Sequence, residues 1–600
     1  MDRWLWHTKS VKQEKTQNHH GKGLLLKLIL PYFKRNWHKI LAGILCMILV
    51  DGAQLIIPQV IKTAVDTLTT AQVDRYILMR QCLLIAGLGL GMAVLRYGWR
   101  ILLMGSARDV EKGIRDDLYR QVLELDMAYF DRIKTGDIMA HATSDIAHVR
   151  MAFGFGLIVL VDTLLLGGTT IGIMIWTDPK LTALALIPMP FLILFTKHLG
   201  QKMHLLHKTA QESFSMLTEQ IRESFFGIRV IKVFNFEKTI EQKVTLASTD
   251  YFKKNLKRAF VTALLRPMLV LFFNLSTLII LFYGGFLVME QRLTPGELVA
   301  FLQYMGVLAW PIIAIGWMTN LFQRGMASLK RINELLDAKS LVQSPQSPAR
   351  PVTIKGRIRF NQAQFSHDPQ QPVLANITMD ISPGTRVGIT GPPGSGKTSL
   401  VQLIPRLYNL TAGSLFIDDH EISRLDPDHI RDHIAFMPQE AFLFSGTLEE
   451  NILLGRKIEQ QRINQIIQAC DLTATIKAMP DGLSTLVGER GVTLSGGQKQ
   501  RVAMARTLII DKPIIILDDP ISQLDTQTAQ TIIDRLKRMN PTATFIIISH
   551  RLSALAACDW IYILDKGRVT GQGRHQDLIE SNKFYANSFR VQQFEAHHEN

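Results

Sequence analysis

The residues with the clearest chemical potential are Gly391–Thr398, which spell GPPGSGKT. They fit the phosphate-binding pattern of a glycine, four residues and then Gly-Lys-Thr. Glycines allow backbone N–H groups to converge on phosphate oxygens, and the N-terminus of a following helix adds positive potential. The flanking residues agree, because Arg386–Thr390 predicts a buried strand and Ser399–Leu407 a helix. The candidate nucleotide-binding residues here are Gly391, Pro392, Pro393, Gly394, Ser395, Gly396, Lys397, Thr398 and Ser399.

Two side chains of this loop are expected to act directly on a nucleotide. Lys397 should reach the β- and γ-phosphates, and Thr398 should offer its hydroxyl to Mg²⁺. A second Mg²⁺-binding group follows later, in Ile514–Asp519, IIILDD. Its apolar run is typical of a buried parallel strand. Asp518 emerges at the carboxyl end of that strand, where it can hold Mg²⁺.

A third motif, LSGGQKQR, begins at Leu494. Its serine and glycines open a predicted helix and form a second anion-binding N-terminus. Together the three motifs resemble those of the ATP-binding-cassette family, whose signature is LSGGQ. The resemblance implies that the signature closes over ATP held by another cassette, so that a complete site needs two cassettes head to tail. The signature residues are Leu494, Ser495, Gly496, Gly497 and Gln498.

Further pieces of the family pattern follow in the expected order. Gln439, in MPQEAFLFSGT, resembles the residue that senses Mg²⁺ and water and contacts the membrane part. Asp525, in SQLD, resembles the D-loop, and His550, in SHRLS, resembles the switch histidine at the γ-phosphate. Gly488–Gly491, GERG, resembles an exporter-type loop that touches the membrane helices. The resemblance thus implies Mg²⁺ ligation by Thr398, Gln439 and Asp518, and catalytic roles for Asp519, His550 and Gln439.

Two positions depart from the family pattern. Asp519 stands where most members have the Glu that aligns the attacking water, and an error of about 1 Å in such positioning can cost about 10²-fold in rate. Hydrolysis at this site is therefore expected to be slow, as in the MdlA-type degenerate-site subunits of heterodimeric bacterial exporters, which this pattern resembles. A homodimer with two weak sites is the alternative. His367, in FSH, replaces the usual tyrosine that stacks on adenine and offers a smaller ring.

Composition separates the chain into a membrane part and a soluble part. Apolar residues make up 47% of the 600 residues and crowd into the first 325 or so positions. Segments of about 20 mostly apolar residues can cross a bilayer. Six are expected, with the second to fifth continuing as helices into the cytoplasm: Lys39–Thr63, Ile77–Met104, Phe155–Trp176, Leu181–Leu199, Phe260–Met289 and Leu298–Phe322.

Charge predicts the orientation of these spans. The formal net charge is +15, and many basic residues lie between Lys197 and Arg258. The positive-inside rule places such stretches in the cytoplasm, and an even number of spans then puts both termini there. Membrane orientation explains the basic residues without a nucleic-acid partner. The first 23 residues lack the apolar core of a signal peptide, and a bacterial inner membrane is the expected location.

An amphipathic segment, Leu24–Trp37, precedes the first span. It is expected to lie along the inner membrane surface; the alternative is a plain first turn of the first helix. Polar residues inside the spans have two open interpretations, a substrate pathway or snorkelling and structural pairing. Two of them, Arg100 and Arg266, sit towards span ends, which favours the second interpretation for them. The residues are Asp51, Gln54, Arg96, Arg100, Asp162, Arg266 and Asn274.

The predicted fold class is a membrane all-α six-helix transmembrane domain of the cassette-exporter type, joined to an α/β P-loop NTPase nucleotide-binding domain. The membrane half also resembles the exporters: Asp131–Asp145 and Gln220–Glu237 look like their two cytoplasmic coupling regions. The expected domains are an N-terminal segment with an amphipathic helix (1–36), the transmembrane domain (37–336), a linker (337–352), the cassette (353–586) and a polar tail (587–600).

The predicted function is ATP-driven export of hydrophobic or amphipathic compounds by a dimer of half-transporters. ATP and Mg²⁺ are the expected cofactors, and a second half-transporter, membrane lipid and the cargo are the expected partners. The fused order, with the membrane part first, favours export over import. An ATP-gated regulator or scaffold that does not transport is the alternative from another class. Drug, lipid and peptide cargoes all remain open.

Overall fold

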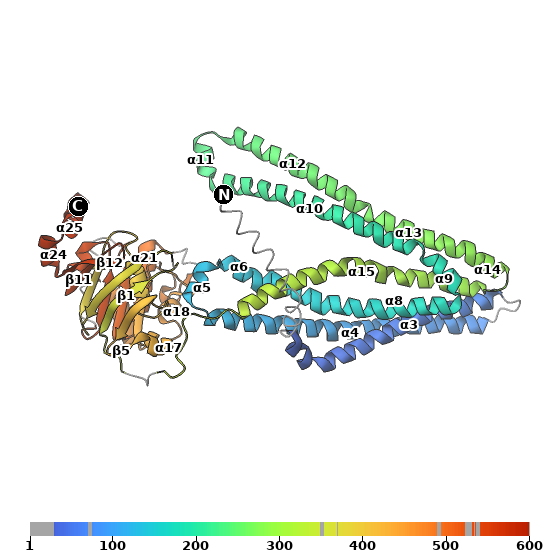
Figure 1. The fold of residues 1–600 in the computed structure, drawn as a ribbon, viewed down its shortest axis with the longest axis horizontal. Helices are drawn as coiled ribbons and strands as arrows, with labels where there is room; N and C mark the ends of the chain where they lie inside the picture. Colours follow the sequence, from blue (N-terminus) through green and yellow to red (C-terminus); the bar gives the residue numbers. More distant parts are fainter. Residues whose placement is uncertain are drawn as a thin grey trace. The chain divides into compact units, whose positions relative to one another are not determined.

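The computed structural model describes residues 29–69, 75–348, 353–368, 370–488, 494–522, 531–532, 535 and 540–598. The chain divides into two compact units (Figure 1). The first unit comprises Met1–Leu123 and Gly136–Asp337. The second comprises Glu124–Thr135 and Ala338–Asn600.

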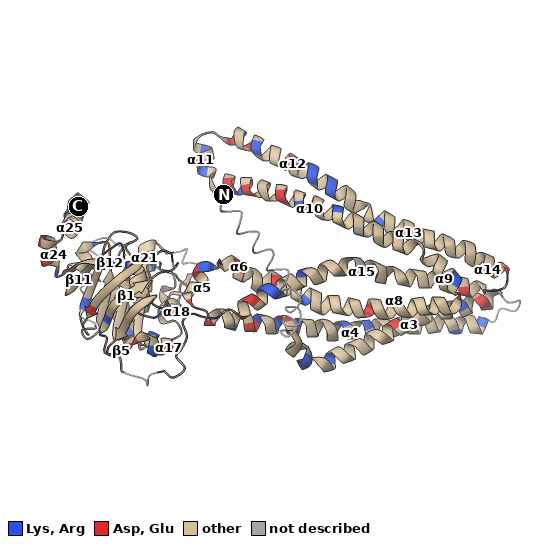
Figure 2. Ribbon diagram, in the orientation of Figure 1, with Lys and Arg blue, Asp and Glu red and all other residues tan. Residues whose placement is uncertain are grey.

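The first unit is helical and contains six segments long and apolar enough to cross a membrane, which confirms the six predicted spans. Figure 2 shows that Lys, Arg, Asp and Glu are sparse along α8 (Leu157–Thr177) and α13 (Leu265–Ile279). Most spans run well beyond bilayer length, as predicted for the second to fifth. The segments are Trp37–Thr69, Arg75–Glu124, Thr135–Thr177, Pro179–Phe226, Glu237–Met289 and Pro295–Leu336.

Proline explains two interruptions within these spans, because it removes a backbone donor and crowds the preceding turn. The fourth span breaks at Ile187, before Pro188, and the fifth breaks at Leu264, close to Pro267. Capping residues fix the starts of others: Asp178 caps one helix, and Thr294 forms a capping box with Glu297. The elements are α3 (Trp37–Thr69), α4 (Arg75–Glu124), α6 (Thr135–Ala140), η1 (His141–Asp145), α7 (Ile146–Val149), η2 (Arg150–Gly156), α8 (Leu157–Thr177), α9 (Pro179–Leu186), α10 (Pro188–Phe226), α11 (Ile228–Val233), α12 (Glu237–Ala263), α13 (Leu265–Ile279), η3 (Ile280–Gly284), α14 (Gly285–Met289) and α15 (Pro295–Leu336).

Helix α15 packs against both α3 and α8, whereas α10 pairs with α12 (Figure 1). Tyr304 of α15 is 1% exposed; its hydroxyl donates to the backbone oxygen of Leu55 at 3.0 Å and accepts from the Gln59 side chain at 2.8 Å. Of the predicted amphipathic segment Leu24–Trp37, residues 24–28 lie outside the described part of the chain. Residues 29–35 are helical, and a turn at Asn36 separates them from α3.

A buried ion cluster holds α15 to the segment before α8. Asp145 is 4% exposed and accepts two hydrogen bonds from the guanidinium of Arg331. It also accepts from the Ser328 hydroxyl at 2.8 Å, and the ring of His141 lies 2.7 Å away. Removing one partner of such a pair leaves a buried charge uncompensated, so the cluster fixes the position of this end of α15.

The second unit is an α/β domain with two main sheets, in agreement with the predicted class. A six-stranded sheet has the order β12-β11-β3-β10-β9-β6, parallel except at the edge strand β12, and a four-stranded antiparallel sheet has the order β2-β1-β4-β5. The strands are β1 (Ile358–Phe365), β2 (Leu374–Ile381), β3 (Arg386–Thr390), β4 (Ala412–Ile417), β5 (His420–Glu421), β6 (Ile434–Met437), β7 (Gly446–Thr447), β8 (Leu486–Val487), β9 (Ile514–Asp518), β10 (Thr544–Ile548), β11 (Trp560–Asp565) and β12 (Arg568–Gly573).

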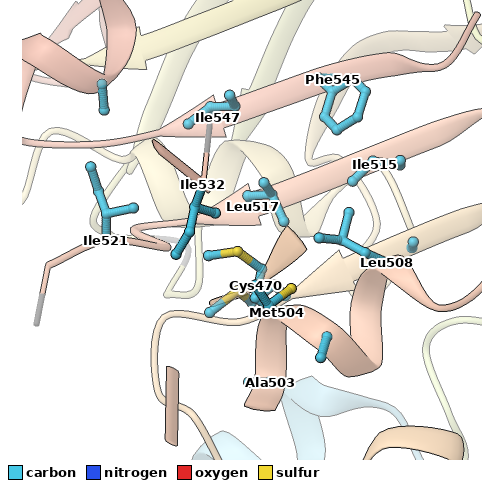
Figure 3. Packing of buried hydrophobic residues seen from close by; sticks show 14 of the residues in the cluster. Cys470, Ala503, Met504, Leu508, Ile515, Leu517, Ile521, Ile532, Phe545 and Ile547 are labelled. Atoms are coloured by element: carbon cyan, nitrogen blue, oxygen red, sulfur yellow. The ribbon is translucent and has the colours of Figure 1, made fainter. Parts of the chain in front are cut away.

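Helices cover both faces of the six-stranded sheet, because successive residues of a strand point to opposite sides. Ile515 and Leu517 of β9 belong to one core cluster with the residues of α21, shown in Figure 3. Ile514 and Ile516 belong to a second cluster with the residues of α16. The helices are α5 (Met127–Arg132), α16 (Lys397–Gln402), η4 (Ile422–Arg424), α17 (Pro427–Arg431), α18 (Leu448–Leu453), α19 (Gln460–Ala469), α20 (Thr473–Lys477), η5 (Gly482–Ser484), α21 (Gly496–Leu508), α23 (Leu552–Leu555), α24 (His575–Ser581) and α25 (Lys583–His598).

Candidate nucleotide site

The loop Gly391–Thr398 connects β3 to α16, as its motif predicts. Gly391, Gly394 and Gly396 have φ values of +147°, +76° and +96°, which favour glycine. A Cβ at Gly391 would lie 1.9 Å from the backbone oxygen of Leu564, so no larger residue fits there without movement. These constraints produce the tight turn that aims backbone N–H groups towards one point.

The helix after the loop is shorter than predicted. The sequence pattern predicts a helix over Ser399–Leu407, but α16 spans Lys397–Gln402 and turns follow it. Pro405 gives the physical reason, because the residue before a proline is disfavoured in the helical conformation. The start of α16 still lies at the loop, where a phosphate would meet it.

Lys397 holds its ammonium group inside the loop. The residue is 6% exposed, and Nζ donates to the backbone oxygens of Gly391 at 2.9 Å and Pro392 at 2.8 Å. Burial lowers the pKa of Lys397, while the charges of Asp518 and Asp519 act in the opposite direction. The positive charge is therefore positioned before any phosphate arrives.

Asp518 at the end of β9 lies against this loop. It is 1% exposed, and its carboxyl group interacts with the hydroxyl of Thr398. Burial raises the pKa of Asp518 to about 6, and Thr398 opposes this shift. Its Oδ2 is buried without a hydrogen-bond partner among the residues that the structure describes. An orphaned carboxylate oxygen beside a hydroxyl fits Mg²⁺, which prefers hard oxygen ligands.

Asp519 follows in a turn with φ +51°, an uncommon conformation for a residue other than glycine. Its backbone N–H donates to the backbone oxygen of Ile548 at 2.9 Å, and its own backbone oxygen accepts from the Gln500 side chain at 3.3 Å. Gln500 also donates to the hydroxyl of Ser522 at 2.7 Å. These bonds hold the Asp519 backbone in place. Gln500 therefore positions the turn that carries Asp519. The LSGGQKQR motif alone did not predict this role.

His550 follows β10 and lies close enough to Lys397 and Asp519 for the charges of both to affect its pKa. Partial desolvation of the imidazole, and then the charge of Lys397, lower the pKa of His550 below its usual value. The ring is therefore mainly neutral at pH 7, and one nitrogen carries a lone pair while the other can donate. Its backbone oxygen accepts from the Gln592 side chain at 2.8 Å. The structure thus gathers Lys397, Asp518, Asp519 and His550 in one place.

The signature residues open α21. Ser495 forms a capping box with Gln498: the Gln498 backbone N–H donates to the serine hydroxyl at 3.3 Å, and the serine N–H donates to the Gln498 side chain at 3.0 Å. Met504 and Ala503 of α21 belong to the same buried cluster as Leu517 of β9 (Figure 3). Because α16 packs with the other face of that sheet, the signature and the phosphate loop of one cassette start on opposite sides of it.

The other predicted site residues are Gln439, Asp525, the GERG loop and Ser399. Gln439 follows β6, is exposed, and shows no hydrogen bond to Asp518 within the described ranges. Asp525 lies outside the described residues, as do residues 489–491 of the GERG loop. Ser399 is half-buried, and its hydroxyl lies 3.5 Å from Nε2 of His367.

His367 lines a cavity of about 500 Å³ together with residues of α5 and with Tyr408. Its ring meets those of Phe365 and Tyr408 edge-on, at centroid distances of 4.7 and 5.1 Å. Its Nδ1 lies 3.7 Å from Oδ2 of Asp131 in α5, and the Tyr408 hydroxyl donates to the same oxygen at 2.8 Å. Burial raises the pKa of Tyr408, followed by the hydrogen bond to Asp131, so the phenol stays protonated.

The short helix α5 is part of this second unit. Its cap, Asp126, accepts hydrogen bonds from the backbone N–H groups of Leu341 and Val342, and from the hydroxyl of Ser340 at 3.2 Å. Neither Asp126 nor Tyr408 was predicted from the sequence. The signal that could have found them is the coupling-region resemblance, which begins at Asp131 in the same helix.

Comparisons with known proteins agree with this arrangement. The family model "ABC transporter transmembrane region" matches residues 40–312, and the model "ABC transporter" matches residues 374–522. The chain is 34% identical over 570 residues to the multidrug resistance-like ATP-binding protein MdlA of Escherichia coli, covering 94% of this chain and 96% of that protein. This chain belongs to the ABC transporters.

Two further relatives place this ABC transporter among the exporters. It is 34% identical over 575 residues to the probable multidrug resistance ABC transporter ATP-binding/permease protein YheI of Bacillus subtilis, covering 95% of this chain and 98% of that protein. The solved structure of a bacterial Atm1-family ABC exporter with ATP bound superimposes with a TM-score of 0.76 at 25% identity, covering 93% of this chain and 98% of that one. The chain is therefore a multi-pass, multidrug-resistance-like exporter half with an ATP-binding domain, of a family that works as dimers.

Proposed function

We propose that this chain is the slowly hydrolysing half of a heterodimeric exporter. It moves hydrophobic or amphipathic compounds out of the cytoplasm across a bacterial inner membrane, with both termini and the cassette on the cytoplasmic side. The proposal depends on one observation: Asp519 occupies the position where the family pattern has Glu, and its side chain is one methylene shorter.

The local backbone supports slow hydrolysis. A shorter side chain could be compensated if the backbone moved towards the phosphates, but the Asp519 turn is bonded to Ile548 on one side and Gln500 on the other. Because these bonds hold the Asp519 backbone, we expect its carboxylate to fall short of the place that a Glu would reach. An attacking water would be poorly aligned, and the expected loss is on the order of 10²-fold.

Nucleotide binding is expected to survive this change. Lys397 binds phosphate, while Thr398 and Asp518 present oxygens to Mg²⁺, with Gln439 as the third proposed ligand. When bound, MgATP would supply the free energy of phosphoryl transfer. His367 stacks on adenine, and the mainly neutral His550 can donate one hydrogen bond at the γ-phosphate.

The sheet supports a dimer. Since α16 and α21 pack with opposite faces of the six-stranded sheet, we expect the signature of one cassette to lie away from its own phosphate loop. Residues 494–498 would then complete the site of a partner that carries Glu, and Asp525 would lie between the two. The proposed domain limits are 1–36, 37–336, 337–352, 353–586 and 587–600.

The test compares ATP turnover by the purified chain with turnover by the chain together with a second half-transporter that carries Glu at this position. The lone chain should hydrolyse slowly, and Asp519→Glu should accelerate it by about 10²-fold. Asp519→Asn is the matched control and should not accelerate it. Fast, cargo-stimulated turnover by the unmodified lone chain would instead establish a homodimeric exporter. ATP binding without any flux in vesicles containing both halves would establish a regulator or scaffold.

A further inference from the structure

Polar residues from three membrane helices meet inside the first unit. Asp51 and Gln54 belong to α3, Arg96 to α4 and Asp162 to α8. The carboxyl groups of Asp51 and Asp162 interact directly, although 111 positions (162 minus 51) separate them in sequence. These helices run together in the unit (Figure 1), and α15 contributes Trp310, whose side chain interacts with Asp162. We call these five residues the carboxyl-pair cluster.

Asp51 is an unusual residue for this position. It is 6% exposed, and its Oδ2 receives no hydrogen bond from any residue in the described part of the chain. The nearest cationic group does not neutralise it by direct pairing, because Arg96 donates at 3.0 Å to the side-chain oxygen of Gln54. A buried carboxyl oxygen without a hydrogen-bond donor is costly in an apolar environment. The cluster therefore presents an acceptor that its own residues leave unused.

The charges in the cluster do not balance. Two carboxyl groups face one guanidinium, and both carboxyl groups feel Arg96 as the opposing charge. Trp310 of α15 contributes a hydrogen-bond donor but no charge. With both acids ionised, one negative charge is left over within a bilayer, where ionised side chains usually face a partner or a wet cavity. Two carboxyl groups in contact cannot easily both be ionised, so one proton can supply the missing positive charge.

We propose that the carboxyl-pair cluster recognises the positive charge of an amphipathic cargo, which takes the place of the proton held between Asp51 and Asp162. As the cation enters, the proton leaves to water, and the cluster remains neutral in both states. The Trp310 side chain is 48% exposed and offers an aromatic face to the same cation. This inference rests on the proposed export function and adds to it a substrate class, monovalent cations with an apolar body.

Binding to the resting full-length chain in lipid nanodiscs tests this inference without ATP. The probe is radiolabelled tetraphenylphosphonium, an apolar cation, and triphenylphosphine oxide is its neutral counterpart. The unmodified chain should bind the cation more tightly as the pH rises from 6 to 8, because a proton competes with it. The affinity for the neutral compound should stay constant over this range.

Variants separate charge recognition from apolar packing. Asp162→Asn and Asp51→Asn should each weaken cation binding by about 10-fold or more and remove its pH dependence, since a charged partner is lost. Arg96→Gln should strengthen cation binding, because it removes the competing positive charge. Asp109→Asn is the matched control: it also deletes one carboxylate from the first unit, but an exposed one paired with Lys39 at 2.9 Å.

Elution of each variant as a single symmetrical peak in size-exclusion chromatography reports whether the membrane part has folded, because the substitutions lie in the first unit and nucleotide binds to the second. Unchanged cation affinity in both folded Asp variants would overturn the inference, and so would equal weakening for the neutral compound. If the Asp variants do not fold, the Arg96→Gln variant decides, because weaker or unchanged cation binding contradicts the proposal. Failure of ATP-driven export would not affect these measurements, so the two proposals can fail separately.

Discussion

Asp518→Asn should stabilise the nucleotide-free cassette while removing its response to Mg²⁺. In the folded protein, burial moves the pKa of Asp518 from its usual 3.8 to about 6. That difference corresponds to about 3 kcal/mol of preference for the neutral carboxyl group. By linkage, the free-energy cost of burying the ionised Asp518 carboxylate is absent below pH 3.8. This cost grows as the pH rises towards 6 and is fully present above it. An amide at this position carries no charge and escapes the penalty.

The assay is urea unfolding of the full-length chain in detergent, followed by pulse proteolysis of the cassette. At pH 7.5 without nucleotide, Asp518→Asn should raise the free energy of unfolding by up to about 3 kcal/mol, and the gain should shrink towards pH 4.5. With MgATP the order should reverse, because only the carboxylate holds Mg²⁺ well. For the unmodified chain, the stabilisation by MgATP should fall as the pH drops below about 6.

Asp380→Asn is the matched control. Its carboxylate is paired with Arg357 at 2.6 Å, and that pair lowers the pKa of Asp380. The same substitution there should not stabilise the cassette at pH 7.5. If Asp518→Asn is clearly less stable than the unmodified chain at pH 7.5 without nucleotide, the Asp518 carboxylate has compensation that the structure does not indicate, and burial is not what sets its pKa.

Two further substitutions test the surroundings of the site. Tyr408→Phe removes the hydroxyl that donates to Asp131. Because the Asp131 carboxylate is partly exposed, we expect only a few-fold faster hydrogen exchange over residues 124–135. Unchanged exchange there would contradict a role for this bond in holding α5. Gly391→Ala places a methyl group 1.9 Å from the backbone oxygen of Leu564 at a residue with φ +147°. ATP affinity should therefore fall by at least 10-fold in a filter-binding assay. Gly394→Ala should lower ATP affinity less, because open space surrounds that position.

Local patterns allowed much of this structure to be predicted. The six spans follow from apolar runs of bilayer length, and β3 and β9 follow from short apolar runs beside a phosphate-binding motif and a terminal Asp. The end of α16 was missed because apolar periodicity continues to Leu407, although Pro405 stops the helix earlier. A stricter use of the proline rule would have found it.

Contacts between distant segments could not be predicted in this way. Asp51 and Asp162 were recognised as unusual residues, but their meeting depends on how α3 and α8 pack, and no local pattern contains that information. The same holds for Tyr408 and Asp131, which share a hydrogen bond across 277 positions. Spacing shows which residues can do chemistry, and packing decides which of them do it together.

The hydrogen bonds of Gln500 suggest how the two sites of the proposed dimer influence one another. Gln500 lies on α21, the helix whose start would serve the partner's nucleotide, and it bonds to the turn that carries this chain's own Asp519. A shift of α21 on the partner's ATP would therefore pull on Asp519 and Ser522. In the proposed pair, nucleotide bound beside Asp519 would act on the signature helix through the same hydrogen bonds of Gln500. A slowly hydrolysing site at Asp519 would then keep this connection under the influence of bound nucleotide for longer than a fast site could.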